Sequence, residues 1–158
     1  MKTKFINTKD IKSQKGFTLI ELLVVIGILA ILLSIVLIAI NPARQFGQAN
    51  DTQRRSNVTA ILNAIGAYAA DNHGVLPPGI PVAPAAAADV GTTSICSAIL
   101  STYISAVPTD PSLNKPAITD CSAGLPGTAT NYMVVQDANK RVTVSATGEI
   151  TNPITITR

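Results

Sequence analysis

The chain has 158 residues, a length that allows one small domain and an appendage. Of these residues 47% are hydrophobic but only 4% are aromatic, and the formal net charge is +3. The positive charge is confined to residues 1–16, which hold five lysines and one aspartate, whereas residues 17–158 hold seven basic and eight acidic residues. A general nucleic-acid-binding function is therefore disfavoured, and nucleic acid stays only a minor alternative partner.

Residues 1–16 form a short basic leader, and residues 17–40 form an apolar run that contains one charge, Glu21. As a helix the run would be roughly 36 Å long, and about 20 apolar residues suffice to cross a bilayer. The lysines before it predict a cytoplasmic leader and an exported body. In a secretory signal peptide the small residues of the cleavage site follow the apolar region. Here the small residue Gly16 precedes the apolar run, so cleavage after it would leave the helix on the mature protein.

The run ends at Asn41 and Pro42, where a kink or a local break of the helix is expected. Residues 43–70 are amphipathic and predict a second helical segment, which stops at residues 71–74. Its expected core stripe is Val58, Ile61, Leu62, Ile65 and Ala69. Five polar residues are expected on its other faces, namely Gln53, Arg54, Arg55, Asn57 and Asn63.

The remaining residues predict a small head built largely from strands. Residues 75–93 are rich in Pro, Ala and Gly and predict a loop, and Ser94 is a candidate cap for a short helix through Tyr103. Residues 132–136, 141–146 and 149–157 predict three strands of an antiparallel meander, with turns at residues 137–139 and 147–148. The fold class is therefore α+β. The chain divides into a leader (1–16), an apolar helix (17–41), an amphipathic helix (42–74) and a head (75–158).

The two cysteines, Cys96 and Cys121, both lie in the exported part. An exported compartment permits a disulfide between them, and two free or buried thiols are the alternative. A disulfide would stabilise the fold by roughly 3 kcal/mol in the loop-entropy model. Two cysteines are too few for a structural zinc site, so no metal and no cofactor are expected.

Other candidate sites are weak. His73, the single histidine, has no accompanying nucleophile motif, so the chain is not expected to be an enzyme and His73 is expected at a helix end. Three aspartates could in principle bind Ca²⁺ but lack the dense spacing of a known loop, and turn roles are expected for Asp110, Asp120 and Asp137. Three arginines are expected to make ordinary solvated or intersubunit contacts rather than a DNA-binding strip, namely Arg44, Arg54 and Arg55, with Asp51 as a possible intersubunit partner.

The stretch KGFTLIELLVVIGILAILLSIVL, residues 15–37, resembles the N-terminus of type IV pilins and of the pseudopilins of type II secretion, a class III signal with an N-terminal methylation motif. The resemblance implies that the prepilin peptidase cuts the bond between Gly16 and Phe17. It also implies that the new N-terminal residue, Phe17, is then N-methylated to methylphenylalanine. It also implies extraction from the membrane by an ATPase-driven assembly platform into a helical homopolymer. One departure is that many relatives have a helix-breaking proline where this chain has Ile38, so Pro42 is expected to take that part.

Glu21 has two physical interpretations. An acid near a helix start can reach the interface and favours the helix dipole, which requires no partner. Cleavage after Gly16, however, creates an ammonium at Phe17, which could pair with Glu21 of the same chain or of a neighbour. Because an unpaired ion in an apolar environment is costly, an intersubunit pair would fix the register of assembly.

The sequence thus predicts a structural subunit, a pilin of a bacterial surface pilus. The major pseudopilin of a type II secretion system is the main alternative. Two further alternatives are a membrane-anchored binding domain that does not polymerise and a DNA-binding competence pilin. The expected location is the inner membrane before assembly, and afterwards a cell-surface filament, or the periplasm for a pseudopilin.

Overall fold

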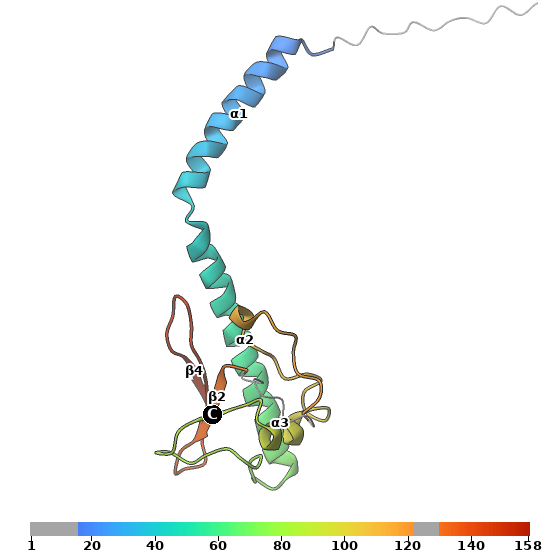
Figure 1. Cartoon of the computed structure of the whole chain (residues 1–158), viewed down its shortest axis with the longest axis vertical. Helices are drawn as coiled ribbons and strands as arrows, with labels where there is room; N and C mark the ends of the chain where they lie inside the picture. Colours follow the sequence, from blue (N-terminus) through green and yellow to red (C-terminus); the bar gives the residue numbers. More distant parts are fainter. Residues whose placement is uncertain (1–15, 122–129) are drawn as a thin grey trace, which may run out of the picture. The chain divides into compact units, whose positions relative to one another are not determined.

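The structure is a computed structural model that describes residues 16–121 and 130–158 (Figure 1). The chain divides into two compact units, Met1–Asn41 and Pro42–Arg158. The first contains the helix α1 (Leu19–Ala39), and the second begins with the helix α2 (Pro42–Asp71). Residues 1–15 of the leader lie outside the described residues.

Helix α1 has the length and composition of a membrane span. It has 21 residues, all of them exposed in the isolated chain, and it is the one helix of the described part that could cross a membrane. At about 1.5 Å per residue it is roughly 31 Å long, close to the ~30 Å hydrocarbon core of a bilayer. Glu21 in its first turn is its single charged residue.

The helical path is interrupted between α1 and α2, as the proline at position 42 predicted. Ile40 takes an extended backbone (φ −92°, ψ 115°) while its N–H still donates to the Val36 carbonyl at 3.0 Å. Asn41 lies outside both helices, and α2 begins with Pro42. A residue before proline avoids the helical region, whereas proline itself is well suited to a first helical position, so the break is local and α2 restarts at once.

The second unit packs α2 against a four-stranded antiparallel sheet, which confirms the α+β class (Figure 1). The strands are β1 (Ala88–Asp89), β2 (Tyr132–Gln136), β3 (Val142–Ala146) and β4 (Ile154–Thr157), in the order β1-β2-β3-β4. Alternate residues of the inner strands enter the core, so the buried face carries Tyr132, Val134, Val142, Val144 and Ala146. From α2 the core receives the expected stripe Val58, Ile61, Leu62 and Ile65, while Ala69 is half-buried.

Three expectations for the head were inexact. The segment 75–93 is not only a loop, because Ala88 and Asp89 pair with Val134 and Met133 as the edge strand β1. The short helix α3 spans Thr93–Ile99 with Thr92 at its N-cap, so Ser94 is not the cap. It stops before Tyr103 because Leu100 is extended and Ser101 has a left-handed backbone (φ 68°).

The last strand is shorter than expected because backbone donors that precede it serve another purpose. The N–H groups of Glu149, Ile150 and Thr151 all donate to the Asp51 carboxylate on α2, at 2.8, 2.9 and 2.8 Å. Three successive donors around one carboxylate form an anion-binding turn and cannot enter a strand ladder. Gly148 is needed at its entrance, since a Cβ there would lie 1.9 Å from the Thr151 carbonyl oxygen.

A buried arginine joins this turn to a second loop. The Arg54 side chain, 2% exposed, donates from Nε and Nη2 to the two carboxylate oxygens of Asp110 at 2.8 Å each. Its Nη1 donates to Asp51 Oδ1 at 2.9 Å, and its Nη2 also reaches Glu149 Oε1 at 3.1 Å. The expectation that Arg54 faces solvent or another subunit was therefore wrong: its partners are in its own chain.

Asn57 is likewise buried rather than exposed. Its Nδ2 donates to the phenolic oxygen of Tyr132 at 2.8 Å, which links α2 to β2. Hydrophobic periodicity placed Arg54 and Asn57 off the core stripe because it scores side chains by polarity. Paired polar groups can nevertheless lie in an interior where their hydrogen bonds are satisfied.

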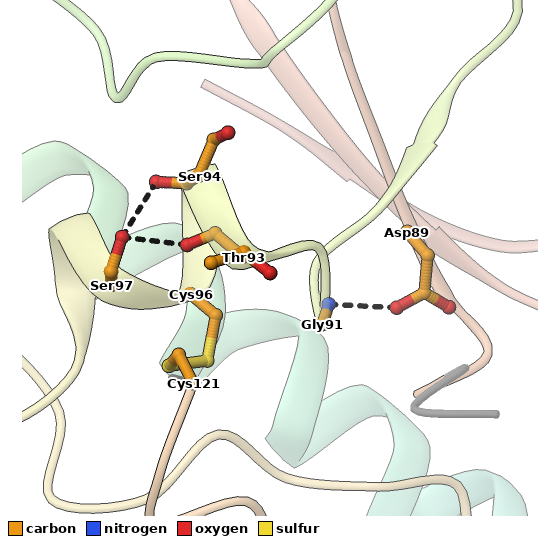
Figure 2. The surroundings of a disulfide bond; sticks show 7 residues. All are labelled: Asp89, Gly91, Thr93, Ser94, Cys96, Ser97 and Cys121. Atoms are coloured by element: carbon orange, nitrogen blue, oxygen red, sulfur yellow. Dashed lines mark hydrogen bonds between the residues drawn. A yellow bond between two sulfur atoms is a disulfide. The ribbon is translucent and has the colours of Figure 1, made fainter. Parts of the chain in front are cut away.

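The disulfide anticipated from the sequence is present between Cys96 on α3 and Cys121, with Cα atoms 5.8 Å apart (Figure 2). Both cysteines are buried beside the core. Ahead of α3, Asp89 accepts the Gly91 N–H at 2.7 Å and so shapes the turn from β1 into the helix (Figure 2). The disulfide thus ties the loop that carries Asp110 to α3, a helix that packs against α2.

Breaking the principal buried pair should destabilise the head. Asp110→Asn removes the negative charge that holds Arg54, and we expect the free energy of unfolding to fall by about 3 kcal/mol, because a buried charge loses its main partner. Urea unfolding of the full-length chain in detergent, followed by circular dichroism, measures the change. The matched control is Asp137→Asn, which breaks an exposed pair with Arg141 and should have a far smaller effect. Equal losses in the two variants would contradict the central place given to Arg54.

The same cluster should make the head sensitive to acid. Burial raises the pKa of Asp51 and Asp110, but hydrogen bonds from the 149–151 turn to Asp51, and from Arg54 and Ser112 to Asp110, outweigh it and hold both pKa values below the usual range. Groups with a lowered folded-state pKa stabilise fully above the unfolded value of about 3.9 and lose this contribution as pH falls through the folded value. We expect the urea midpoint to fall steadily from about pH 5 to below pH 3.

The control for this acid dependence is Arg54→Met. Without the guanidinium, burial still raises the pKa of Asp110 and only the hydrogen bonds from Ser112 still lower it, so this pKa should be higher than in the parent. Acid should therefore weaken this variant less than the parent. Identical pH slopes for parent and variant would show that the Arg54 cluster does not set the acid response.

Candidate processing and assembly site

The bond between Gly16 and Phe17 lies immediately before α1. Neither residue is helical, both are exposed, and the Phe17 side chain is 90% exposed. A Cβ added to Gly16 would meet no atom within 4 Å. The junction is therefore an open, non-helical peptide, which is the form that a protease requires of its substrate.

Thr18 and Glu21 form a reciprocal cap at the start of α1. Thr18 is the N-cap residue, and its Oγ1 accepts the Glu21 N–H at 3.2 Å. In return Glu21 Oε2 accepts the backbone N–H and the hydroxyl of Thr18, both at 2.9 Å. This capping box satisfies two donors that a helix start otherwise leaves without partners.

The capping box leaves part of the Glu21 carboxylate available. Both bonds from Thr18 end on Oε2, and within the described residues no donor is assigned to Oε1. If the chain is cut after Gly16, the new amine belongs to Phe17, one position before the N-cap. A positive charge there opposes the helix dipole, so the acid at the third helical position is well placed to offset it.

The role of Thr18 was not predicted from the sequence, although the spacing Thr-x-x-Glu ahead of a helix is the signature of a capping box. The strong membrane signal of the neighbouring residues hid this local one. Glu21 therefore has a structural partner in its own chain before any assembly partner is considered.

The other predicted residues are spread through the second unit and do not converge on this site. His73 lies just past the end of α2 with a left-handed backbone (φ 55°), as a helix-end residue. Asp137 is a turn residue that accepts the N–H groups of Asn139 and Arg141 at 2.8 Å each.

Asp110 has two roles. It caps the short 3-10 helix η1 (Pro111–Leu113) through the Ser112 N–H, and it is also the main partner of Arg54, so it is more than a turn residue. Within residues 16–121 and 130–158 no cluster of metal-ligating side chains occurs.

Comparison with known proteins identifies a motif at the start of the chain. Residues 11–37 match the profile of the prokaryotic N-terminal methylation motif, which covers the leader end, the Gly16–Phe17 junction and most of α1. The chain therefore carries a prokaryotic N-terminal methylation motif on an apolar N-terminal helix, and that helix has the length and composition of a membrane span. In this segment it is similar to type IV pilins and pseudopilins. Neither the curated proteins nor the solved structures yielded a match.

The capping box makes a direct prediction. Thr18→Val removes the hydroxyl at constant size, and the exchange of the Glu21 amide hydrogen should accelerate by roughly 2- to 30-fold, the equivalent of an N-cap worth about 0.5–2 kcal/mol. Hydrogen exchange by NMR in micelles measures it. Thr18→Ser should restore protection, and Ser34→Ala, which removes a mid-helix hydroxyl bonded to the Ala30 carbonyl, should leave Glu21 unchanged. Equal protection of the Glu21 amide in Thr18→Val and in the parent would show that the Thr18 hydroxyl does not stabilise the start of α1.

Proposed function

We propose that this protein is a structural subunit of a type IV pilus-like filament, made as a membrane-anchored precursor and polymerised through α1. The observation that carries the proposal is the match to the methylation motif on a helix whose every residue is exposed in the isolated chain. Such a helix needs lipid or other apolar helices around it. A filament core of identical helices is a surrounding that the chain can supply by itself.

The second unit fits the part of a subunit head. Its core is closed by α2, the sheet and the disulfide, so it can keep its shape when the surroundings of α1 change from lipid to protein. Its interactions are structural ones, and we propose that the chain is not an enzyme. The partners in this proposal are other copies of the chain, the prepilin peptidase, and an inner-membrane assembly platform with its ATPase.

Glu21 is proposed as the register residue of the filament. Its Oε2 is held by Thr18, which limits the directions in which the carboxylate can accept a further donor. The methylated Phe17 amine of a neighbouring subunit is the donor that processing creates. Pairing in an apolar surrounding favours the register in which every ammonium meets a carboxylate and penalises the others.

Intact mass and N-terminal sequence of protein recovered from sheared cell-surface fractions test the proposal. A mature chain that begins at methylated Phe17 supports it, and a chain that begins at Met1 in such material contradicts it. Electron microscopy then separates the systems: surface filaments composed mainly of this protein favour the pilus. Secretion defects without surface filaments favour a type II pseudopilin, which the same motif would also mark.

Substitution of Glu21 should separate processing from assembly. Glu21→Ala is expected to be cleaved normally, because the cut bond lies before the helix, but to give a filament yield at least tenfold lower, because the Phe17 ammonium loses its partner in an apolar surrounding. Glu21→Gln keeps the size and an oxygen for Thr18 but removes the charge, and it should assemble as poorly as Glu21→Ala. Shear yield and mass spectrometry provide the two measurements. Wild-type filament yield from Glu21→Gln would contradict the ion pair.

A further inference from the structure

The second unit exposes few large apolar side chains in its described part, and two of them lie near the start of α2, the element that follows the α1 span in the chain. In its described part the four that stand out are Phe46, Val75, Val82 and Ile150, at 70%, 61%, 50% and 48% exposed. Phe46 is in the second turn of α2. Ile150 lies over the next residue, Gly47, where an added Cβ would be 3.1 Å from the Ile150 side chain.

The placement of Ile150 is fixed rather than incidental. Its backbone N–H donates to Asp51 Oδ2 at 2.9 Å, in the turn whose three donors hold that carboxylate. Asp51 is in turn held by Arg54. The turn therefore presents an apolar side chain at a set position beside Gly47 of α2, and the buried ionic cluster around Arg54 maintains it there.

Chain length limits how far Phe46 can lie from the end of the α1 span. Helix α1 is about as long as the hydrocarbon core is thick, and only Ile40 and Asn41 separate it from α2. The three steps from Ala39 to Pro42 span at most about 11 Å, and the four steps from Pro42 to Phe46 rise about 6 Å. The Phe46 backbone is therefore at most about 17 Å from the end of the span, whatever the direction of α2, and nearer wherever the linker is not fully extended. Helical side chains also lean toward the helix start.

The headgroup layer on each side of a bilayer is roughly 5–8 Å thick, so a phenylalanine side chain at this position can reach it. Its neighbours suit that environment. Arg44, Gln45 and Gln48 are exposed in the same two turns, and polar side chains with apolar stems are favoured at headgroup level. The three tyrosines differ from Phe46, because Tyr132 is buried and Tyr68 and Tyr103 stack edge to face beside the core.

We propose that Phe46 and Ile150 form a membrane-docking edge, which inserts into the lipid headgroup region on the non-cytoplasmic side while the subunit waits for assembly. This edge would orient the head on the bilayer surface. Extraction of the subunit would then have to remove both α1 and the docking edge from lipid. The proposal rests on membrane anchoring through α1, which belongs to the proposed function, and does not depend on polymerisation.

Single-tryptophan fluorescence tests it well, because the chain has no tryptophan of its own. Phe46→Trp and Ile150→Trp are prepared in the full-length chain, in nanodiscs loaded with one copy each. Lipids brominated near the headgroup end of the acyl chain act as quenchers. Val75→Trp is the matched control, because Val75 is an equally exposed apolar residue that follows the far end of the 30-residue α2.

We expect blue-shifted, strongly quenched emission from Phe46→Trp and Ile150→Trp, and unquenched emission from Val75→Trp. Water-like, unquenched emission from both docking-edge variants would overturn the proposal. So would a shift that appears only in discs with several copies, since the occupant would then be a second copy of the chain. Leu29→Trp, at mid-span of α1, is the control for membrane anchoring, and its emission should be quenched by lipid brominated deep in the acyl chain. Unquenched emission from Leu29→Trp would contradict the membrane anchor and with it this proposal. Quenching of Leu29→Trp without quenching of Phe46→Trp and Ile150→Trp would contradict the docking edge alone.

Discussion

The head depends on one buried guanidinium. Arg54 has a hydrogen bond or ion pair with three carboxylates that come from three places in the sequence: Asp51 one turn earlier on α2, Asp110 before η1, and Glu149 after β3. Apolar packing alone would hold the sheet against α2 without fixing the long loops. The ionic cluster supplies that missing constraint, because each loop provides the counter-charge that the arginine needs in order to be buried. The cost of leaving Arg54 unpaired is what makes the loop positions specific.

Asp51 extends this constraint to the backbone. Its carboxylate is held both by Arg54 and by three consecutive N–H groups, so the turn at residues 149–151 closes around the side chain of a helix nearly 100 residues away. That closure decides where β4 can begin. After Pro153, which has no N–H to donate, Ile154 opens the strand against Ala146. The start of β4 and the apolar side chain of Ile150 are therefore both positioned by one ionic arrangement.

Sequence patterns foresaw the parts of this fold that depend on local periodicity. The α1 span, the interruption at Pro42, the apolar stripe through Ile65 and the strand β2 all follow from composition or from spacing along one segment. The disulfide followed from compartment and cysteine count. What sequence could not supply was the pairing of Arg54 with Asp110, since nothing local distinguishes a buried arginine from the exposed Arg55 beside it. The early end of α3 and the late start of β4 were also not predicted. The left-handed residue Ser101 follows the end of α3, and the distant side chain of Asp51 holds the residues before β4.

Two acids in this chain use backbone donors in contrasting ways. Asp51 is surrounded by donors of its own chain and has its positive partner permanently beside it in Arg54. Glu21 is held by the N-cap of its own helix through one oxygen, and nothing positively charged accompanies it among the described residues. A carboxylate that accepts hydrogen bonds at only one of its two oxygens and has no counter-ion is stable in water or at an interface, but its burial in an apolar core is costly. In the proposed filament the cut at Gly16 supplies the counter-ion, so burial of α1 becomes favourable only after processing, whereas the head, whose charges are already paired, is complete before it.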